Sequence, residues 1–124
     1  MPSPTHVGGL RYHGMAPMLS HLVHHGHVEP RAYNQKECLE AGIQFARTEG
    51  IMPAPEATHA IKGAVDEALK CKVEGNSKAI LFNLCGHGHF DMQAYMDYFS
   101  GKLAEDSFDT KAFEESMASI PAVN

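Results

Sequence analysis

Four stretches of the chain carry apolar residues at intervals of three and four, which is the spacing of an amphipathic helix. They cover residues 34–50, 55–72, 91–101 and 110–119. In the second stretch the apolar stripe is continuous and lies opposite charged residues, which predicts a helix packed by one face on an apolar surface. Gly50 ends the first stretch, since glycine readily adopts the left-handed conformation that closes many helices.

The N-termini of two of these predicted helices carry capping signals. Asn34 and Glu37 have the spacing of a capping box at the start of the first helix. Asp91 is predicted to cap the third helix, because a short acidic side chain accepts hydrogen bonds from the free amides of a first turn. Phe90 and Tyr95, which flank that cap, have the spacing of a hydrophobic staple.

A different pattern, a continuous apolar run, occupies residues 79–84. Such a run is typical of a strand that is buried on both faces of a parallel sheet. Residues 28–33 are a second candidate strand, which Pro30 restricts to a sheet edge. The order of elements predicts an α/β fold with helices packed on a mostly parallel sheet. Because one buried strand cannot form a sheet, we expect the domain to be incomplete in this chain alone.

The composition narrows the class of protein. The chain has 124 residues, enough for one small domain, and a formal net charge of −5, which argues against a nucleic-acid binder. It has no apolar run of membrane-spanning length, and its first residues lack the basic and apolar regions of a secretory signal. The three cysteines, Cys38, Cys71 and Cys85, are widely spaced, which predicts reduced thiols and a cytoplasmic location.

Two loops are candidates for chemistry. One is the sequence CGHGH at residues 85–89, directly after the predicted strand, where ligands gather in open α/β sheets. The other is residues 50–60, in which Glu56 falls in the first turn of a helix and His59 follows on the same face. Each loop also has a purely structural interpretation. Strand-to-helix connections favour glycine, which would explain the CGHGH loop without a ligand. Acidic residues at helix N-termini are commonly solvated charges, which would explain Glu56.

Histidines gather near the N-terminus of the chain, at His21, His24, His25 and His27. His21 and His25 have the i, i+4 spacing of helical metal ligands. The group lacks the HExxH motif and has no cysteine nearby, so surface histidines are the favoured interpretation. A histidine-rich metal binder remains a hypothesis.

Three motifs stand in order along the chain: GLRYHGMAP (Gly9–Pro17), ARTEGIMPAPEATHAI (Ala46–Ile61) and ILFNLCGHGHFDM (Ile80–Met92). Together they resemble the C-terminal region of tryptophan synthase β chains, and more closely the divergent second type. The resemblance runs over about residues 5–103. It divides the chain into a β-like region, residues 1–103, and a helical tail without an assignment, residues 104–124.

The resemblance implies a lyase of the pyridoxal-phosphate enzymes of fold type II. Members of this family make L-tryptophan by β-replacement from indole and serine, or phosphoserine in some divergent forms. The implied cofactors are pyridoxal phosphate and a monovalent cation. The implied partners are these substrates, together with a missing N-terminal half of the protein or further copies of the chain.

The resemblance also implies roles for residues around the cofactor. Glu56 matches the family's glutamate close to the cofactor ring. Cys85 matches the residue, usually serine, that hydrogen-bonds the pyridine nitrogen, and Gly86 follows it as in the family. A neutral hydroxyl or thiol can bond this nitrogen without protonating it. An unprotonated pyridine nitrogen favours β-elimination and replacement over transamination. Cys85 is a departure from the family pattern, because a thiol is a weaker donor than a hydroxyl.

Three residues near the N-terminus take further roles from the resemblance. Arg11 stands where the standard β chain has an aspartate near the substrate hydroxyl, and an arginine there marks the divergent type. Tyr12 and Gly14 match positions whose backbone carbonyls help to form a monovalent cation site.

Two parts of such an enzyme have no counterpart in this sequence. None of the lysines lies in a motif that matches the Schiff-base lysine, and Gly8–Gly9 is too short for a glycine-rich phosphate loop. Lys36, Lys62 and Lys70 are predicted on exposed helix faces, where burial cannot lower the pKa of an amine. We therefore expect the chain alone to be inactive, with a non-catalytic binding module as the alternative function.

Overall fold

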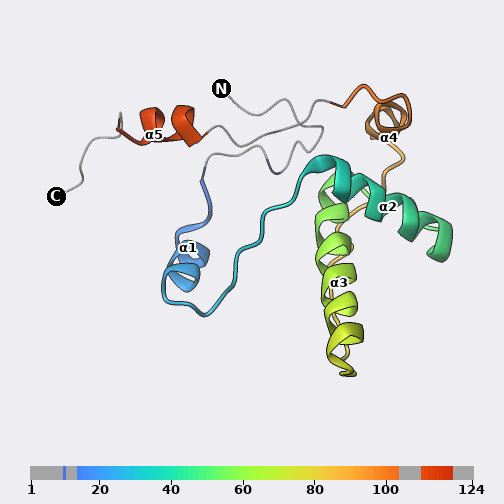
Figure 1. Ribbon diagram of the computed structural model, residues 1–124. Coiled ribbons are helices and arrows are strands. Elements are labelled where there is room, and N and C mark those ends of the chain that lie inside the picture. The colour runs from blue at the N-terminus through green and yellow to red at the C-terminus, as the bar shows by residue number, and fades with distance from the viewer. Residues whose placement is uncertain (1–9, 11–13, 104–109, 119–124) are drawn as a thin grey trace.

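The computed structural model describes residues 10, 14–103 and 110–118, which contain five α-helices (Figure 1). The helices are α1 (Pro17–His24), α2 (Gln35–Glu49), α3 (Pro55–Glu74), α4 (Met92–Phe99) and α5 (Thr110–Ala118). The last four lie where the hydrophobic pattern predicts helices. The sequence pattern did not predict α1, which begins with a proline in its first turn, has no buried residue and lies apart from α2, α3 and α4 (Figure 1).

The predicted capping box at the start of α2 is confirmed, and the predicted side-chain cap of α4 is wrong. The Asn34 backbone N–H donates to Glu37 Oε1 at 2.8 Å, and Gly50 closes α2 in the left-handed conformation with φ of 72°. The Asp91 side chain makes no capping hydrogen bond. The staple is also absent, because Phe90 is 92% exposed with its ring beside His87, whereas Tyr95 turns into the core.

The packing of α2 against α3 depends on a close approach at Gly42. A Cβ atom at this position would lie 2.5 Å from Thr58 Cγ2, so only glycine lets the two helices come this near. The contact buries Cys38 on α2 and Ala57 and Ile61 on α3. The predicted apolar stripe of α3 is therefore buried near the start of the helix.

The described core continues from α2 to α4. Leu39 and Ile43 on α2 pack with Ala94 and Tyr95 on α4. Partly buried apolar residues close the edges of this cluster: Met52, Tyr98 and Leu103. The short helix α4 is thus fixed by its contact with α2, which places the loop before α4 next to the start of α3.

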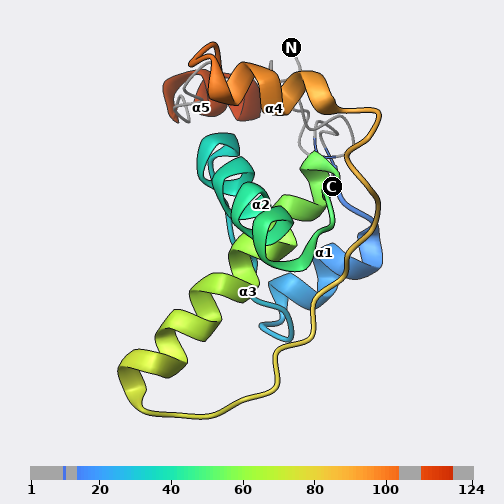
Figure 2. The ribbon, with the colours of Figure 1, turned by 90° about the vertical axis from the view of Figure 1, so that its right-hand side faces the viewer.

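The predicted strand at residues 79–84 is absent. These residues form an irregular connection that runs from the far end of α3 back to α4 (Figure 2), and Leu81 on it is 96% exposed. Residues 28–33 are irregular as well. A strand forms by backbone hydrogen bonds to a neighbouring strand, and the described residues contain no strand with which this segment could pair. The helical part of the α/β prediction is confirmed, and the sheet is not.

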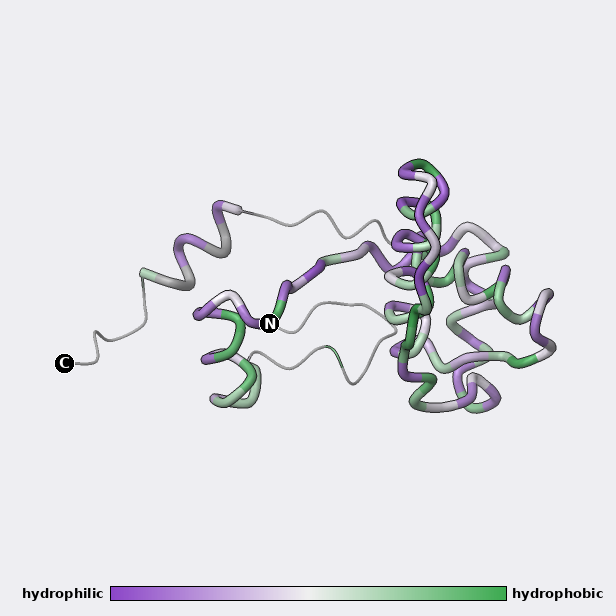
Figure 3. Tube along the Cα trace, turned by 90° about the horizontal axis from the view of Figure 1, so that it is seen from below, coloured by the Kyte–Doolittle hydropathy of each residue, from purple (hydrophilic) through white to green (hydrophobic). Residues whose placement is uncertain are grey.

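Large apolar side chains remain exposed on several elements of the described chain. Val73 at the end of α3 is 88% exposed, and Met96 and Phe99 on α4 are exposed as well. Figure 3 shows hydrophobic stretches on α1 as well as on the α2–α4 unit. None of the helices among the described residues is long and apolar enough to cross a membrane.

The isolated chain is expected to self-associate, because large apolar side chains are exposed on several of its elements. Sedimentation velocity should show species larger than 13.5 kDa, increasing with concentration. A compact soluble monomer with cooperative unfolding would contradict this expectation.

Candidate functional site

The two loops that the sequence singles out lie side by side. The backbone N–H of Ala54 donates to the Gly86 carbonyl at 3.0 Å, and the N–H of Gly88 donates to the Met52 carbonyl at 2.8 Å. These two bonds flank an isolated antiparallel bridge between Pro53 and His87. The loop before α3 and the loop before α4 are therefore joined, although Pro53 and His87 are 34 positions apart along the chain.

We call the contact between residues 52–54 and residues 86–88 the junction. Tyr95 holds this junction from the core side. Its hydroxyl donates to the Pro53 carbonyl at 2.6 Å, and its side chain is almost fully buried. Burial raises the pKa of Tyr95 to about 12, so the phenol is protonated and acts as a donor at neutral pH. The buried Pro53 carbonyl thereby gains the partner that a buried backbone acceptor requires.

The glycines of the CGHGH loop are required by the junction. A Cβ atom at Gly88 would lie 2.4 Å from the Pro53 carbonyl oxygen and 3.1 Å from the Tyr95 ring. Gly86 has a φ of 147°, which side-chain-bearing residues rarely adopt. Glycine at these two positions lets the backbones of the two loops approach each other.

The junction brings together the regions of three predicted cofactor residues. Glu56 lies in the first turn of α3, two residues after Ala54, and is partly buried. Gly86 accepts the hydrogen bond from Ala54, and Cys85 immediately precedes it with an exposed free thiol. A carboxylate, a thiol and a closely approached backbone thus lie around one pair of loops, next to the N-terminus of α3.

The residues predicted near the substrate and the cation are not brought to this junction. Arg11 and Tyr12 lie outside the described residues. Gly14 is exposed, in the irregular segment before α1, with nothing within 4 Å of where its Cβ would stand. Their roles stay predictions.

Lys62 departs from its predicted exposed position. It is partly buried and pairs with Asp66 one turn along α3 and with Glu37 on α2, whereas Lys36 and Lys70 are exposed as predicted. The hydrogen bond to Asp66 is the main cause that raises the pKa of Lys62 and lowers the pKa of Asp66. Lys62 is therefore a protonated partner in an ion pair, the opposite of an activated amine nucleophile.

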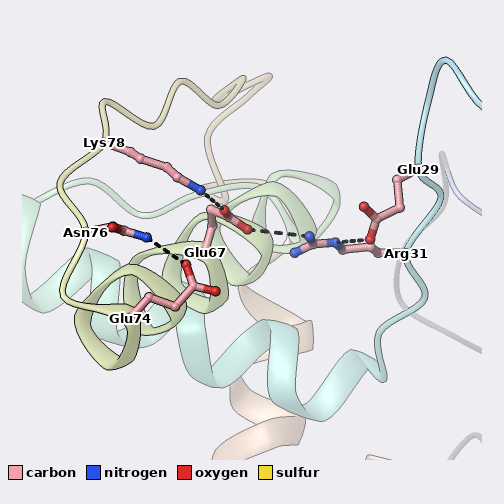
Figure 4. Close-up of polar contacts among 6 residues, drawn as sticks. All are labelled: Glu29, Arg31, Glu67, Glu74, Asn76 and Lys78. Atoms are coloured by element: carbon pink, nitrogen blue, oxygen red, sulfur yellow. Dashed lines mark hydrogen bonds and ion pairs between the residues drawn. The ribbon is translucent and has the colours of Figure 1, made fainter.

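Glu67 connects α3 to two irregular segments (Figure 4). Its carboxylate accepts from Lys78 at 3.2 Å, in the connection that returns toward α4, and from Arg31 at 3.5 Å, before α2. Glu29 extends the group through its bond from Arg31, and a separate bond joins Asn76 to Glu74. These contacts hold the start of the connection that ends at Cys85.

Glu67→Gln is expected to loosen residues 76–79 with little change in the unfolding temperature, because exposed ion pairs contribute little to stability. The Lys78 hydrogen bond lowers the pKa of Glu67, so the pairing is present above the ordinary carboxyl pKa and is lost as the pH falls through the lowered value. Amide hydrogen exchange at Asn76, whose backbone N–H donates to the Cys71 carbonyl at 2.9 Å, measures the loosening. Glu40→Gln on the exposed surface of α2 is the control, and equal exchange in both variants would contradict the prediction.

The cysteines divide into two core residues and one exposed thiol. Cys38 and Cys71 are buried and Cys85 is exposed. Burial raises the pKa of Cys38 to about 12, so its thiol is protonated and inert at neutral pH. Among the described residues no group of three or more histidine, cysteine or acidic side chains is arranged to hold a metal ion.

The sequence pattern missed the structural role of Tyr95, which it assigned only to a staple. No local signal links Tyr95 to its acceptor, which is 42 residues away along the chain.

Comparison with known proteins gives a consistent set of relatives, although no family model matches the chain. Tryptophan synthase beta chain 2 of Aquifex aeolicus is 58% identical over 105 residues, which are 85% of this chain and 24% of the relative. The protein of the same name from Thermococcus kodakarensis is 59% identical over 102 residues, 82% of this chain and 23% of the relative. This chain is therefore similar to one region of the tryptophan synthase β chains.

The similarity to tryptophan synthase β chains covers nearly all of this sequence. The tryptophan synthase beta chain of Pyrococcus horikoshii is 50% identical over 118 residues, 95% of this chain and 25% of the relative. The chain thus spans about a quarter of the length of the curated relatives it matches. The resemblance to the second type of β chain, over one region only, is confirmed.

Proposed function

We propose that this chain supplies one wall of the pyridoxal-phosphate site in a lyase that makes L-tryptophan. The observation that carries the proposal is the pair of backbone hydrogen bonds that joins the loop before Glu56 to the loop after Cys85. The names of the relatives support the reaction class. Serine or phosphoserine, and indole, are the proposed substrates.

The residues at the junction fit the cofactor in their chemistry. Cys85 offers an exposed thiol as a donor, and Gly86 beside it offers backbone without a side chain in the way. Glu56 lies in the first turn of α3, on the same side of the junction as the loop that contacts Gly86. The pyridine ring of pyridoxal phosphate is flat and has one nitrogen that accepts a hydrogen bond, so it suits a thiol donor beside an uncovered stretch of backbone.

When bound, pyridoxal phosphate supplies an electron sink that allows the β-substituent of an amino acid to be replaced by indole. Cys85 would hold the ring nitrogen through a neutral hydrogen bond, which leaves that nitrogen without a full positive charge. The close approach of the loops at Gly86 and Gly88 would keep the wall rigid. Glu56 would orient a polar group beside the ring through its carboxylate.

The remainder of the site is proposed to come from outside these 124 residues. A longer polypeptide would contribute the Schiff-base lysine and the phosphate loop, and this chain alone would be inactive. Neighbouring strands from that part would turn residues 79–84 into a buried strand of a fold type II sheet. Arg11 would lie near the substrate, Tyr12 and Gly14 at a monovalent cation, and the enzyme would act in the cytoplasm.

A chimeric enzyme tests this proposal. Residues 5–103 of this chain would replace the matching residues of the Aquifex aeolicus relative, and tryptophan formation would be measured with serine or phosphoserine, indole and pyridoxal phosphate. We expect the chimera to make tryptophan. Glu56→Gln should lower its rate by about a hundredfold, an effect typical of a positioned polar group at a reacting centre. Glu40→Gln, on an exposed face of α2, should leave the rate unchanged.

A chimera that folds and binds pyridoxal phosphate but makes no tryptophan, under conditions in which the parent does, would contradict the proposal. That outcome would favour the alternative, a non-catalytic binding module.

Cys85→Ser in the active chimera is expected to preserve or raise the rate of tryptophan synthesis, because a hydroxyl is a better hydrogen-bond donor than a thiol. The rate is measured with saturating cofactor, so that a change in cofactor affinity does not obscure it. Complete loss of synthesis in this variant would refute the role assigned to Cys85.

A further inference from the structure

The histidines of α1 lie outside the proposed cofactor site and form a group of their own. The rings of His21 and His25 have centroids 4.0 Å apart, and the ring of His24 lies 5.1 Å from that of His25. All three side chains are exposed, as is His27. An ion in solution therefore has direct access to them.

The helical geometry continues through His25 and sets the spacing of the pair. The backbone N–H of His25 donates to the His21 carbonyl at 3.1 Å, so the two side chains are one helical turn apart on the same face. Two nitrogens that share a tetrahedral ion at about 2.0–2.1 Å each lie about 3.3 Å apart. The ring centroids of His21 and His25 are 4.0 Å apart, so the two rings are close enough to share one ion.

The His25 ring also makes the hydrogen bond that prepares a histidine for metal binding. Its Nδ1 lies 2.9 Å from the His21 carbonyl oxygen, and a carbonyl only accepts, so Nδ1 carries the hydrogen. The lone pair of the neutral ring is then on Nε2. Ligating histidines in metal sites commonly donate their other N–H to a backbone carbonyl in this way, which fixes the tautomer and the ring orientation.

We propose that His21 and His25 form an exposed two-imidazole site for a divalent transition-metal ion of the kind that prefers nitrogen ligands, such as Ni²⁺, Cu²⁺ or Zn²⁺. The two Nε2 atoms coordinate the ion, and water occupies the remaining positions. Hard ions that prefer oxygen, such as Mg²⁺, are not bound. This site is independent of the proposed tryptophan-forming reaction.

Titration of the full chain with Ni²⁺ by isothermal calorimetry at pH 7.5 tests this site. We expect one ion to bind per chain, and Mg²⁺ not to compete. His21→Ala and His25→Ala should each weaken the affinity at least about tenfold. Alanine favours helix, so both variants should retain α1. His89→Ala, which removes an exposed histidine of the CGHGH loop, should leave the affinity unchanged.

Nitrogen-15 NMR of the histidine rings provides a second readout that does not depend on any variant. Ni²⁺ is paramagnetic, so Zn²⁺ is used, and the Nε2 resonances of His21 and His25 should shift together with stoichiometric ion. Unchanged affinity in His21→Ala or His25→Ala, or Zn²⁺ shifts confined to other histidines, would overturn the proposal.

Discussion

Replacing Gly88 by alanine is expected to separate the two loops of the junction and to destabilise the fold. The added Cβ would lie 2.4 Å from the Pro53 carbonyl oxygen, and the nearest obstacle is backbone, which cannot rotate away. Overpacking of this kind costs about 1–3 kcal/mol in the free energy of unfolding. Urea unfolding at low protein concentration measures the cost, and amide exchange at Ala54 reports the separation of the loops.

Gly63→Ala is the matched control for this substitution. Its nearest neighbour is the Tyr33 hydroxyl at 3.8 Å, an ordinary contact, and alanine is favoured over glycine inside a helix by about 1 kcal/mol. Gly63→Ala should therefore be neutral or stabilising. If Gly88→Ala is equally harmless and leaves amide exchange at Ala54 unchanged, the claim that the two loops approach each other closely at Gly88 is contradicted.

Tyr95→Phe is expected to weaken the junction while the aromatic packing is kept. The Pro53 carbonyl is buried and would lose its donor at 2.6 Å, which costs about 1–3 kcal/mol. Tyr95→Ala removes the ring as well and should cost about 3–5 kcal/mol. Tyr98→Phe, a partly buried tyrosine on the same helix, should change stability by no more than about 0.5 kcal/mol. Comparable losses in Tyr95→Phe and Tyr98→Phe would contradict the account.

The contribution of Tyr95 to stability is expected to depend on pH. Burial raises the pKa of Tyr95 from 10.0 to about 12, so the folded state keeps a proton that the unfolded state loses first. This contribution is fully present below pH 10 and is lost as the pH rises toward 12. Tyr95→Phe should show a smaller loss of stability than the unchanged chain over this range.

Local signals in the sequence account for most of the helical structure. The capping box of Asn34 and Glu37 and the left-handed Gly50 act within one turn, so the bounds of α2 could be predicted closely. Residues 79–84 carry an equally clear apolar pattern, but a strand depends on partners elsewhere. Pattern alone could not show that the described chain has none.

The pairing of the two loops could be expected for a different reason. Nothing in the spacing of Glu56 and Cys85 places them together, and their proximity was expected only from the resemblance to tryptophan synthase β chains. The contacts that create the junction are non-local: Tyr95 with Pro53, and Gly88 with Met52. Each joins residues more than 30 positions apart, beyond the reach of any helical or strand periodicity.

The affinity of the chimeric enzyme for pyridoxal phosphate, followed by the absorbance of the bound cofactor, tests the central claim most directly. Cys85→Ala removes the proposed donor to the ring nitrogen and should weaken binding about tenfold and shift the absorbance maximum, as loss of one hydrogen bond predicts. Cys85→Ser should bind at least as tightly as the unchanged chimera. If Cys85→Ala leaves both the affinity and the absorbance spectrum unchanged, the loops around Cys85 and Glu56 do not form the wall of the cofactor site.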